Sequence, residues 1–203
     1  MSAPSRKRTA VKRGFDLLVA ILMLPIVVPL LALVALAIRI DSPGPIVFTQ
    51  LRTGKNGRRF RMFKFRTMVR NAEELKASLQ HLNILPPPDF KIIDDPRITR
   101  VGKFLRKTSL DELPQILNVL RGEMSFVGPR PTSFAPETYS LWHTERLEVT
   151  PGITGLWQVK GRNSMTFDER LRLDIHYVRN WTFALDLRIL ALTATAVFAR
   201  AGA

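Results

Sequence analysis

The sequence predicts a mainly helical α/β fold in which a small β-hairpin and several amphipathic helices follow an N-terminal membrane helix. Residues 17–38 contain no charged side chain, which is typical of a membrane segment. Residues 46–52 and 60–67 have the composition of two strands joined by a glycine-containing connection, and apolar residues recur at helical spacing beyond residue 100. We therefore expect a basic arm over residues 1–14, a membrane helix over 15–40 and one domain over 41–203.

The composition narrows the class of partner. The 203 residues include 31 Lys and Arg against 17 Asp and Glu, which gives a net charge of +14. This charge favours nucleic acid, acidic lipid or a phosphorylated substrate. The chain has no cysteine, which excludes a disulfide framework and a thiolate metal site. The three histidines lack metal-site spacing, and neither a Walker loop nor G-x-G-x-x-G occurs.

The apolar segment is long enough to cross a membrane. Its roughly 22 residues would form a helix on the order of 33 Å long, which is too long for a signal peptide's apolar region. Pro25 and Pro29 lie near its middle, and each removes a backbone hydrogen bond. Both flanks are basic, so the positive-inside tendency favours the cytoplasmic side for both. Two alternatives remain open: a re-entrant helix broken near Pro29, and a kinked helix that spans the membrane.

Turn residues and apolar spacing predict the elements that follow. We expect helices over residues 71–82, 100–107, 134–146, 166–180 and 185–200, and short strands over 124–127 and 156–159. The last of these helices is too short to cross a membrane comfortably, so we expect it in the membrane interface or over the core.

The stretch over residues 108–118 is the most informative for function. Ser109 is a favourable N-cap, and Glu112 completes the S-x-x-E pattern of a capping box. Pro114 is tolerated in the first turn, and Gly122 is expected to end this helix. Asp111 and Glu112 bring two carboxylates to the positive end of the helix dipole. The residues alone leave open whether these acids only stabilise the helix or form an acidic site.

Basic residues in rigid loops accompany the two acids. Arg130 lies between two prolines at 128–131, which suits either a preorganised phosphate or carboxylate contact or a rigid surface turn. Arg162 lies in a basic turn at 160–163 that can face an anion. Asp174, on the helix predicted over 166–180, is either a site acid or a solvated charge.

Five segments of the chain resemble the bacterial sugar transferases, also called monotopic phosphoglycosyl transferases. They are Phe-Lys-Phe-Arg-Thr-Met at 63–68, Ser-Leu-Asp-Glu-Leu-Pro-Gln at 109–115, the segment 118–131 that ends in Gly-Pro-Arg-Pro, Pro-Gly-Ile-Thr-Gly at 151–155, and Gln-Val-Lys-Gly-Arg-Asn at 158–163. The motifs occur in the family's order, and the resemblance runs from about residue 12 to residue 200.

The resemblance implies an enzyme at the cytoplasmic face of the bacterial inner membrane. The family transfers a sugar-1-phosphate from a UDP-sugar to a polyprenyl phosphate, usually undecaprenyl phosphate, and releases UMP. Asp111 matches the nucleophile that forms an aspartyl-phosphosugar intermediate, and Glu112 matches the partner carboxylate that helps to hold Mg²⁺. The polar family positions that we expect to bind substrate are matched by Lys64, Arg106, Arg130, Arg162 and Asp174.

The resemblance also favours the re-entrant form of the membrane helix. The family breaks this helix at a Ser-Pro pair; here Pro29 matches the proline, Val28 replaces the serine, and Pro25 is additional. A membrane-tethered binder of anionic lipid or nucleic acid without catalysis is the alternative class. That alternative has no use for paired acids, so we expect no nucleic-acid partner. Glu112 cannot close the capping box and bind a metal with the same oxygens, and the two roles are separable by structure.

Overall fold

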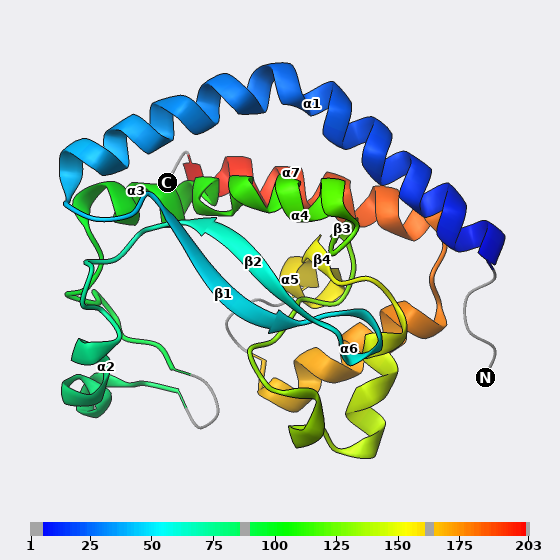
Figure 1. The fold of residues 1–203 in the computed structure, drawn as a ribbon. Coiled ribbons are helices and arrows are strands. Elements are labelled where there is room, and N and C mark those ends of the chain that lie inside the picture. Colours follow the sequence, from blue (N-terminus) through cyan, green and yellow to red (C-terminus); the bar gives the residue numbers. More distant parts are fainter. Residues whose placement is uncertain (1–5, 86–89, 161–164, 202–203) are drawn as a thin grey trace.

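A long N-terminal helix covers the rest of the fold in the computed structural model, which describes residues 6–85, 90–160 and 165–201. Figure 1 shows this helix, α1 (Arg6–Asp41), arching over α3 (Arg100–Thr108), α4 (Ile116–Arg121) and α7 (Phe183–Ala201). The hairpin of β1 (Val47–Thr53) and β2 (Arg59–Phe65) lies on the other side of these helices from α1. The prediction of a mainly helical fold with a small sheet and a long apolar N-terminal helix is confirmed.

Helix α1 differs from the expectation in its start and in its middle. It begins at Arg6 rather than at residue 15, and it continues through Pro25 and Pro29 without an interruption of the helix. In Figure 1 the helix bends over its middle part instead. A bend is what proline causes when its ring clashes with the carbonyl one turn earlier while the neighbouring hydrogen bonds persist. Within the described chain, α1 is the one helix long and apolar enough to cross a membrane.

One face of α1 packs on the domain along the whole helix. Ala20 and Val27 belong to a buried cluster with β2 and α4, and Val34 and Ile38 belong to a second cluster with β2 and α3. The opposite face is apolar but exposed, as at Ile26, which is 73% exposed. Both halves of α1, before and after the bend, therefore pack on the same domain.

The β1–β2 hairpin forms as the sequence predicts. The strands are antiparallel, and Phe48 pairs with Lys64 and Arg52 with Phe60. A short 3₁₀ helix, η1 (Lys55–Gly57), connects them, with Asn56 and Gly57 at positive φ. Residues 71–82 are less regular than expected: α2 (Glu74–Ser78) is one short helix, and the 3₁₀ turn η2 (Gln80–Leu82) follows it.

The capping box predicted at Ser109 is wrong. Ser109 has φ 60°, ends α3 in the left-handed conformation and makes no side-chain cap. A 3₁₀ helix, η3 (Leu110–Gln115), follows directly and leads into α4, which Gly122 ends at φ 78° as expected. The side chain of Glu112 is thereby free of any capping role, and both acids are presented by a tight turn between two helices.

The second half of the domain contains one further correction. β3 (Ser125–Val127) forms as predicted and pairs in parallel with β4 (Gly152–Thr154), a strand that the sequence did not predict. Residues 156–159, predicted as a strand, belong to the helix α5 (Leu156–Lys160). The segment 134–146 contains two 3₁₀ helices, η4 (Pro136–Thr138) and η5 (Leu141–Glu148), in place of one α-helix.

The last two helices are predicted correctly and complete the core. α6 (Phe167–Arg179) begins with a capping box formed by Thr166 and Glu169, and α7 follows it. Tyr177 on α6 and Ile189 on α7 are buried in a cluster with Val127 and Leu156.

Candidate active site

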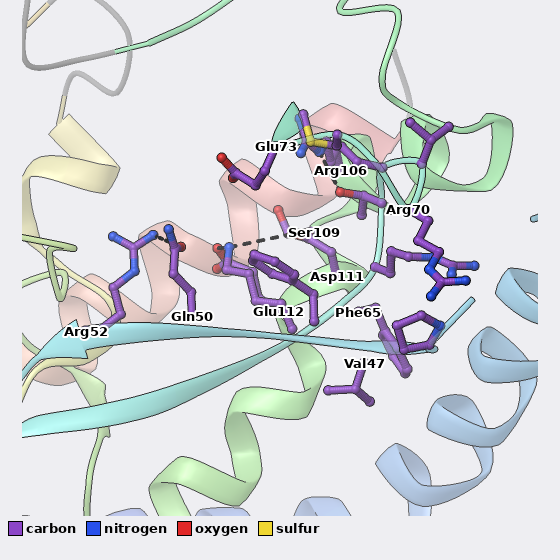
Figure 2. Close-up of a pocket in the computed structure, with 18 of the residues that line it drawn as sticks. Val47, Gln50, Arg52, Phe65, Arg70, Glu73, Arg106, Ser109, Asp111 and Glu112 are labelled. Carbon is purple, nitrogen blue, oxygen red and sulfur yellow. Dashed lines mark hydrogen bonds and ion pairs between the residues drawn. The ribbon is translucent and has the colours of Figure 1, made fainter. Parts of the chain in front are cut away.

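The two acids lie in a cavity between the hairpin and η3. The cavity has a volume of about 590 Å³, and Figure 2 shows Glu112, Asp111 and Ser109 beside the hairpin with Gln50 and Arg52 to one side. Basic side chains outnumber acidic ones on its walls. The basic ones are Arg52, Lys64, Arg66, Arg70, Arg106 and Arg130, and the acidic ones are Glu73, Asp111 and Glu112. An excess of positive charge in a cavity of this size favours an anionic ligand.

Glu112 is held by two cations through one oxygen. Its Oε1 accepts hydrogen bonds from Lys64 Nζ at 2.8 Å and from Arg130 Nη2 at 2.6 Å. Burial alone would raise the pKa of Glu112, but Arg130 and Lys64 together hold this pKa far below its ordinary value. Glu112 is therefore a permanently ionised and fixed carboxylate, which accounts for its absence from a helix cap.

Asp111 is in a different electrostatic situation although it is the adjacent residue. Its only ion pair within the described chain is with Lys64, whose Nζ lies 3.6 Å from Oδ2, beyond hydrogen-bond distance. Burial raises the pKa of Asp111, and Glu112 adds to the rise, while Lys64 and Arg106 oppose it. The raised pKa makes the carboxylate of Asp111 more basic than usual. Within the described chain, no cation lies in short ionic contact with it.

Arg106 approaches Asp111 from α3. Its Nε donates to Thr67 Oγ1 at 2.9 Å, which fixes the guanidinium at the end of the hairpin. Burial lowers the pKa of Arg106, whereas the negative charge of Asp111 raises it. Lys64, Arg106 and Arg130, three of the five predicted substrate-binding residues, therefore line the same cavity as the acids.

Arg130 is fixed by its loop and by a second arginine. Pro129 and Pro131 restrict the backbone on both sides, and the carbonyl oxygen of Arg130 accepts a hydrogen bond from Arg146 Nη2 at 2.5 Å. Its own Nη1 donates to Ile153 O at 3.4 Å. The negative charge of Glu112 raises the pKa of Arg130. The Pro-Arg-Pro segment therefore holds Arg130 against Glu112, as a rigid fork.

Asp174, predicted to bind substrate, lies outside the cavity lining. It is 1% exposed and accepts hydrogen bonds from Arg146 Nε at 3.1 Å and Nη2 at 2.5 Å. Burial raises its pKa to about 6, against the opposing charge of Arg146. Asp174 on α6 binds Arg146, which in turn donates to the carbonyl oxygen of Arg130, so Asp174 supports the loop of Arg130 from behind, and its predicted contact with substrate stays a prediction. Arg162, the fifth predicted residue, lies outside the described residues.

Two cavity residues were missed by the sequence interpretation. Gln50 and Arg52 lie two residues apart on β1, and the register puts them across from Met62 and Phe60, on the face of the hairpin that carries Lys64. Arg52 Nη2 donates to Gln50 Oε1, and Nη1 donates to Pro131 O at 3.3 Å. The sequence interpretation gave neither residue a role in the site, because the strand register that brings them beside Lys64 is known only from the structure.

The two acids offer carboxylate oxygens of the kind that Mg²⁺ prefers. Mg²⁺ uses one or two carboxylates together with phosphates and water. Lys64 and Arg130 both bind Glu112 through Oε1, so Oε2 and the Asp111 carboxylate are the oxygens that could meet such an ion. In the residues that the structure describes, no group of three or more His, Cys, Asp and Glu side chains forms a metal site made of protein ligands alone.

Comparison with known proteins places these features in a family. The model of the family described as bacterial sugar transferase matches residues 7–200. The chain is 49% identical over 162 residues to the galactosyl transferase CpsE of Streptococcus agalactiae, covering 79% of this chain and 36% of that protein. It is 45% identical over 203 residues to the undecaprenyl-phosphate galactose phosphotransferase of Salmonella typhimurium, covering 98% and 42%.

A shorter relative is matched over most of its length. The chain is 44% identical over 191 residues to the exopolysaccharide production protein ExoY of Sinorhizobium fredii, covering 92% of this chain and 84% of that protein. By contrast, it spans less than half the length of the two relatives above. Since the family match takes in almost every residue from α1 to α7, the chain belongs to the bacterial sugar transferase family.

Proposed function

We propose that the protein transfers a sugar-1-phosphate from a UDP-sugar to a polyprenyl phosphate and releases UMP. The observation that carries this proposal is that two adjacent acids in a basic cavity have different environments. Glu112 is fixed by Lys64 and Arg130, whereas Asp111 keeps a carboxylate without a short contact. One acid is therefore available for covalent chemistry while the other is available to organise charge. The Salmonella relative is named for the same kind of transfer.

The proposed reaction proceeds in two displacements at one phosphorus atom. A carboxylate oxygen of Asp111 forms a bond to the β-phosphorus of the donor, and the bond from this phosphorus to the bridging oxygen breaks, so that UMP leaves with the electron pair. An oxygen of the acceptor phosphate then bonds to the same phosphorus, and the aspartyl oxygen leaves as carboxylate. Phosphoryl transfer depends chiefly on positioning and charge neutralisation, which Lys64, Arg106 and Arg130 supply.

Magnesium belongs to this proposal as a cofactor held by Glu112 and the substrate. When bound, Mg²⁺ neutralises charge on the diphosphate. The chain's own part is to keep Glu112 ionised, which the neighbouring Arg130 and Lys64 do. The low pKa of Glu112 keeps it a carboxylate at every pH at which the protein is expected to work.

The proposal places the enzyme on a membrane, with α1 as a re-entrant anchor at the cytoplasmic face. The acceptor is a lipid and the donor is soluble in water, so the cavity must open where the two meet. Both ends of α1 are tied to the same body: Lys12 pairs with Asp186 at 2.5 Å, and Asp41 accepts from the Val101 N–H at 3.2 Å. A helix held at both ends by one domain favours an arch that enters and leaves the membrane on one side, with its exposed apolar face in lipid.

Replacement of the nucleophile tests the proposed reaction. Asp111→Asn should abolish the covalent adduct formed with a UDP-sugar labelled in its β-phosphate, and should abolish UMP release with undecaprenyl phosphate. UDP-galactose is the first donor to try, since two of the relatives are named for galactose transfer. Asp94→Asn is the matched control, because the ion pair of Asp94 in the described part of the chain is an exposed one with Lys103. A stable labelled adduct on the Asp111→Asn protein would contradict the assignment.

A further inference from the structure

Arg52, like Arg66, is a basic residue of the cavity that keeps unused hydrogen-bonding capacity within the described chain. Its guanidinium offers five N–H donors. Within the described chain one goes to Gln50, one makes a 3.3 Å contact with Pro131, and the buried Nε has no partner. A buried donor without a partner costs free energy, so its persistence calls for a ligand or another compensating group.

The surroundings of Arg52 favour a ligand that carries negative charge. Burial and the charges of Arg130 and Arg59 lower the pKa of Arg52 to about 10, and Glu112 only partly opposes them. A cation placed near other cations is stabilised by an anion that bridges them. Gln50 and Pro131 each accept one N–H from the guanidinium, from Nη2 and Nη1 respectively, so each of these nitrogens keeps a second N–H for an anion in the cavity.

The position of Arg52 relative to the acids defines which anion it meets. In Figure 2, Arg52 and Gln50 lie on one side of Glu112, whereas Arg106 and Arg70 lie on the other, beyond Asp111. Arg130 and Glu112 influence the pKa of both Arg52 and Asp111, whereas Arg106 is among the main influences on Asp111 alone. Attacking and leaving oxygens lie roughly in line across a phosphoryl group that is transferred. A phosphorus attacked by Asp111 therefore has its leaving group directed away from Asp111, toward the Arg52 side.

The same geometry applies to both displacements of the proposed reaction. The acceptor oxygen must attack the adduct opposite the aspartyl oxygen, at the place that the UMP oxygen has vacated. The donor and the lipid product are also alike, since each is a diphosphate that ends in the transferred sugar phosphate. We infer that Arg52 binds the phosphate that is not transferred, first the α-phosphate of the UDP-sugar and then the phosphate of the polyprenyl acceptor. This inference rests on the proposed function.

Nucleotide binding without chemistry gives the first test. In an Asp111→Asn background, Arg52→Ala should weaken UMP binding about tenfold or more, the typical value of a charge-assisted hydrogen bond, and leave uridine binding unchanged. Arg52→Lys should fall between, because it keeps the charge but loses the fork. Arg61→Ala is the matched control, since Arg61 is an exposed arginine on the same hairpin outside the cavity lining. Unchanged UMP binding in Arg52→Ala, or an equal loss for uridine, would overturn the inference.

The two half-reactions give the second test, with Asp111 intact. Arg52→Ala should slow adduct formation from the UDP-sugar and also slow discharge of a preformed adduct by undecaprenyl phosphate, each about tenfold or more. Thermal unfolding of the variant should match that of Arg61→Ala. A defect in only one half-reaction would show that the two phosphates do not share Arg52. If the parent chain formed no adduct with any UDP-sugar, the proposed function itself would fail, a result distinct from normal adduct chemistry in Arg52→Ala.

Discussion

Asp111 and Glu112 carry the same functional group on adjacent residues, yet their environments move their pKa values in opposite directions. Two short cationic contacts on Glu112 outweigh its burial, and the single longer contact on Asp111 does not. Such a pair with separated pKa values is typical of acids that have different tasks in one site. A nucleophile gains from the basicity that burial confers, provided that a nearby cation keeps it ionised at working pH.

Lys64 is that cation, and its removal has a predictable effect on pH dependence. In the proposed reaction Asp111 attacks as a carboxylate, so the rate of adduct formation is expected to fall when the pH drops through its raised pKa. Lys64→Met removes the largest influence that lowers this pKa. We expect the acid limb of the pH–rate profile to move to higher pH and the rate at neutral pH to fall about tenfold or more. The measurement is single-turnover adduct formation against pH at saturating donor.

The control for this prediction distinguishes the loss of a lysine in the site from the loss of one positive charge elsewhere on the protein. Lys103→Met removes a lysine whose ion pair with Asp94 is largely exposed, so its profile should coincide with that of the unmodified chain. An acid limb that stays in place or moves to lower pH in Lys64→Met would show that Lys64 does not set the ionisation of Asp111.

At the scale of elements, the site depends on how closely α3 approaches the end of the hairpin. Gly102 on α3 faces the backbone of Thr67, and a Cβ built at Gly102 would overlap the Thr67 carbonyl group. Thr67 also receives the N–H of Thr99 at 3.1 Å and holds Arg106 through its hydroxyl. The absence of a side chain at Gly102 therefore allows α3 to bring Arg106 to Asp111.

Gly102→Ala tests this packing. The methyl group must push α3 from the hairpin, which should lower the free energy of unfolding by about 1–3 kcal/mol and reduce adduct formation through displacement of Arg106. Gly14→Ala is the matched control: nothing lies within 4 Å of its Cβ, and alanine in the helix α1 should add about 1 kcal/mol. Thermal unfolding in detergent and adduct formation measure both effects. Wild-type values for Gly102→Ala would contradict the close approach.

The same elements show how far the sequence could predict the structure. The sequence alone predicts the long periodic segments, such as α6 and α7. It also predicts the hairpin, through its glycine-containing connection. The turn at Ser109 is not predictable in this way, because the S-x-x-E pattern fits a capping box equally well. What decides against the capping box is that Lys64 and Arg130, which are distant in sequence, bind Glu112. The short run Leu156–Lys160 was ambiguous between strand and helix by periodicity alone. β4 forms only because β3 offers a parallel partner.

The residues of the candidate site likewise divide into those that the sequence predicts and those that depend on contacts between distant segments. Asp111, Glu112, Lys64 and Arg130 lie in the sequence motifs that resemble the family, Arg106 matches a further polar position of the family, and the structure gathers all five in one cavity. Asp174 also matches a polar position of the family, but its inward position depends on the packing of α6 against Arg146. Arg52 could be found only from the strand register, which depends on the turn geometry of η1.

At the scale of the molecule, α1 is built into the domain rather than appended to it. Its buried residues belong to the same clusters as β2, α3 and α4, and its N-terminal part binds α4 and α7 through Arg13 and Lys12. Arg13, for example, donates to the carbonyl oxygens of Val119 and Leu120 at the end of α4. The bend at the two prolines lets one helix follow this surface while its outer face stays apolar and exposed. In the proposed membrane-bound arrangement, an anchor of this kind fixes the distance between the cavity and the membrane surface.

Labelling of single cysteines tests this arrangement, and the chain is suited to it because it has no cysteine of its own. Ala10→Cys marks the first turns of α1, and Ser78→Cys marks the exposed end of α2. If α1 is re-entrant, a membrane-impermeant maleimide should label both positions in inside-out vesicles and neither in intact spheroplasts. Detergent-solubilised protein should label at both positions, which controls for accessibility. Labelling of the two positions from opposite sides would mean that α1 crosses the membrane, and the contacts of its N-terminal half with α4 and α7 would then have to be absent in the membrane-bound protein.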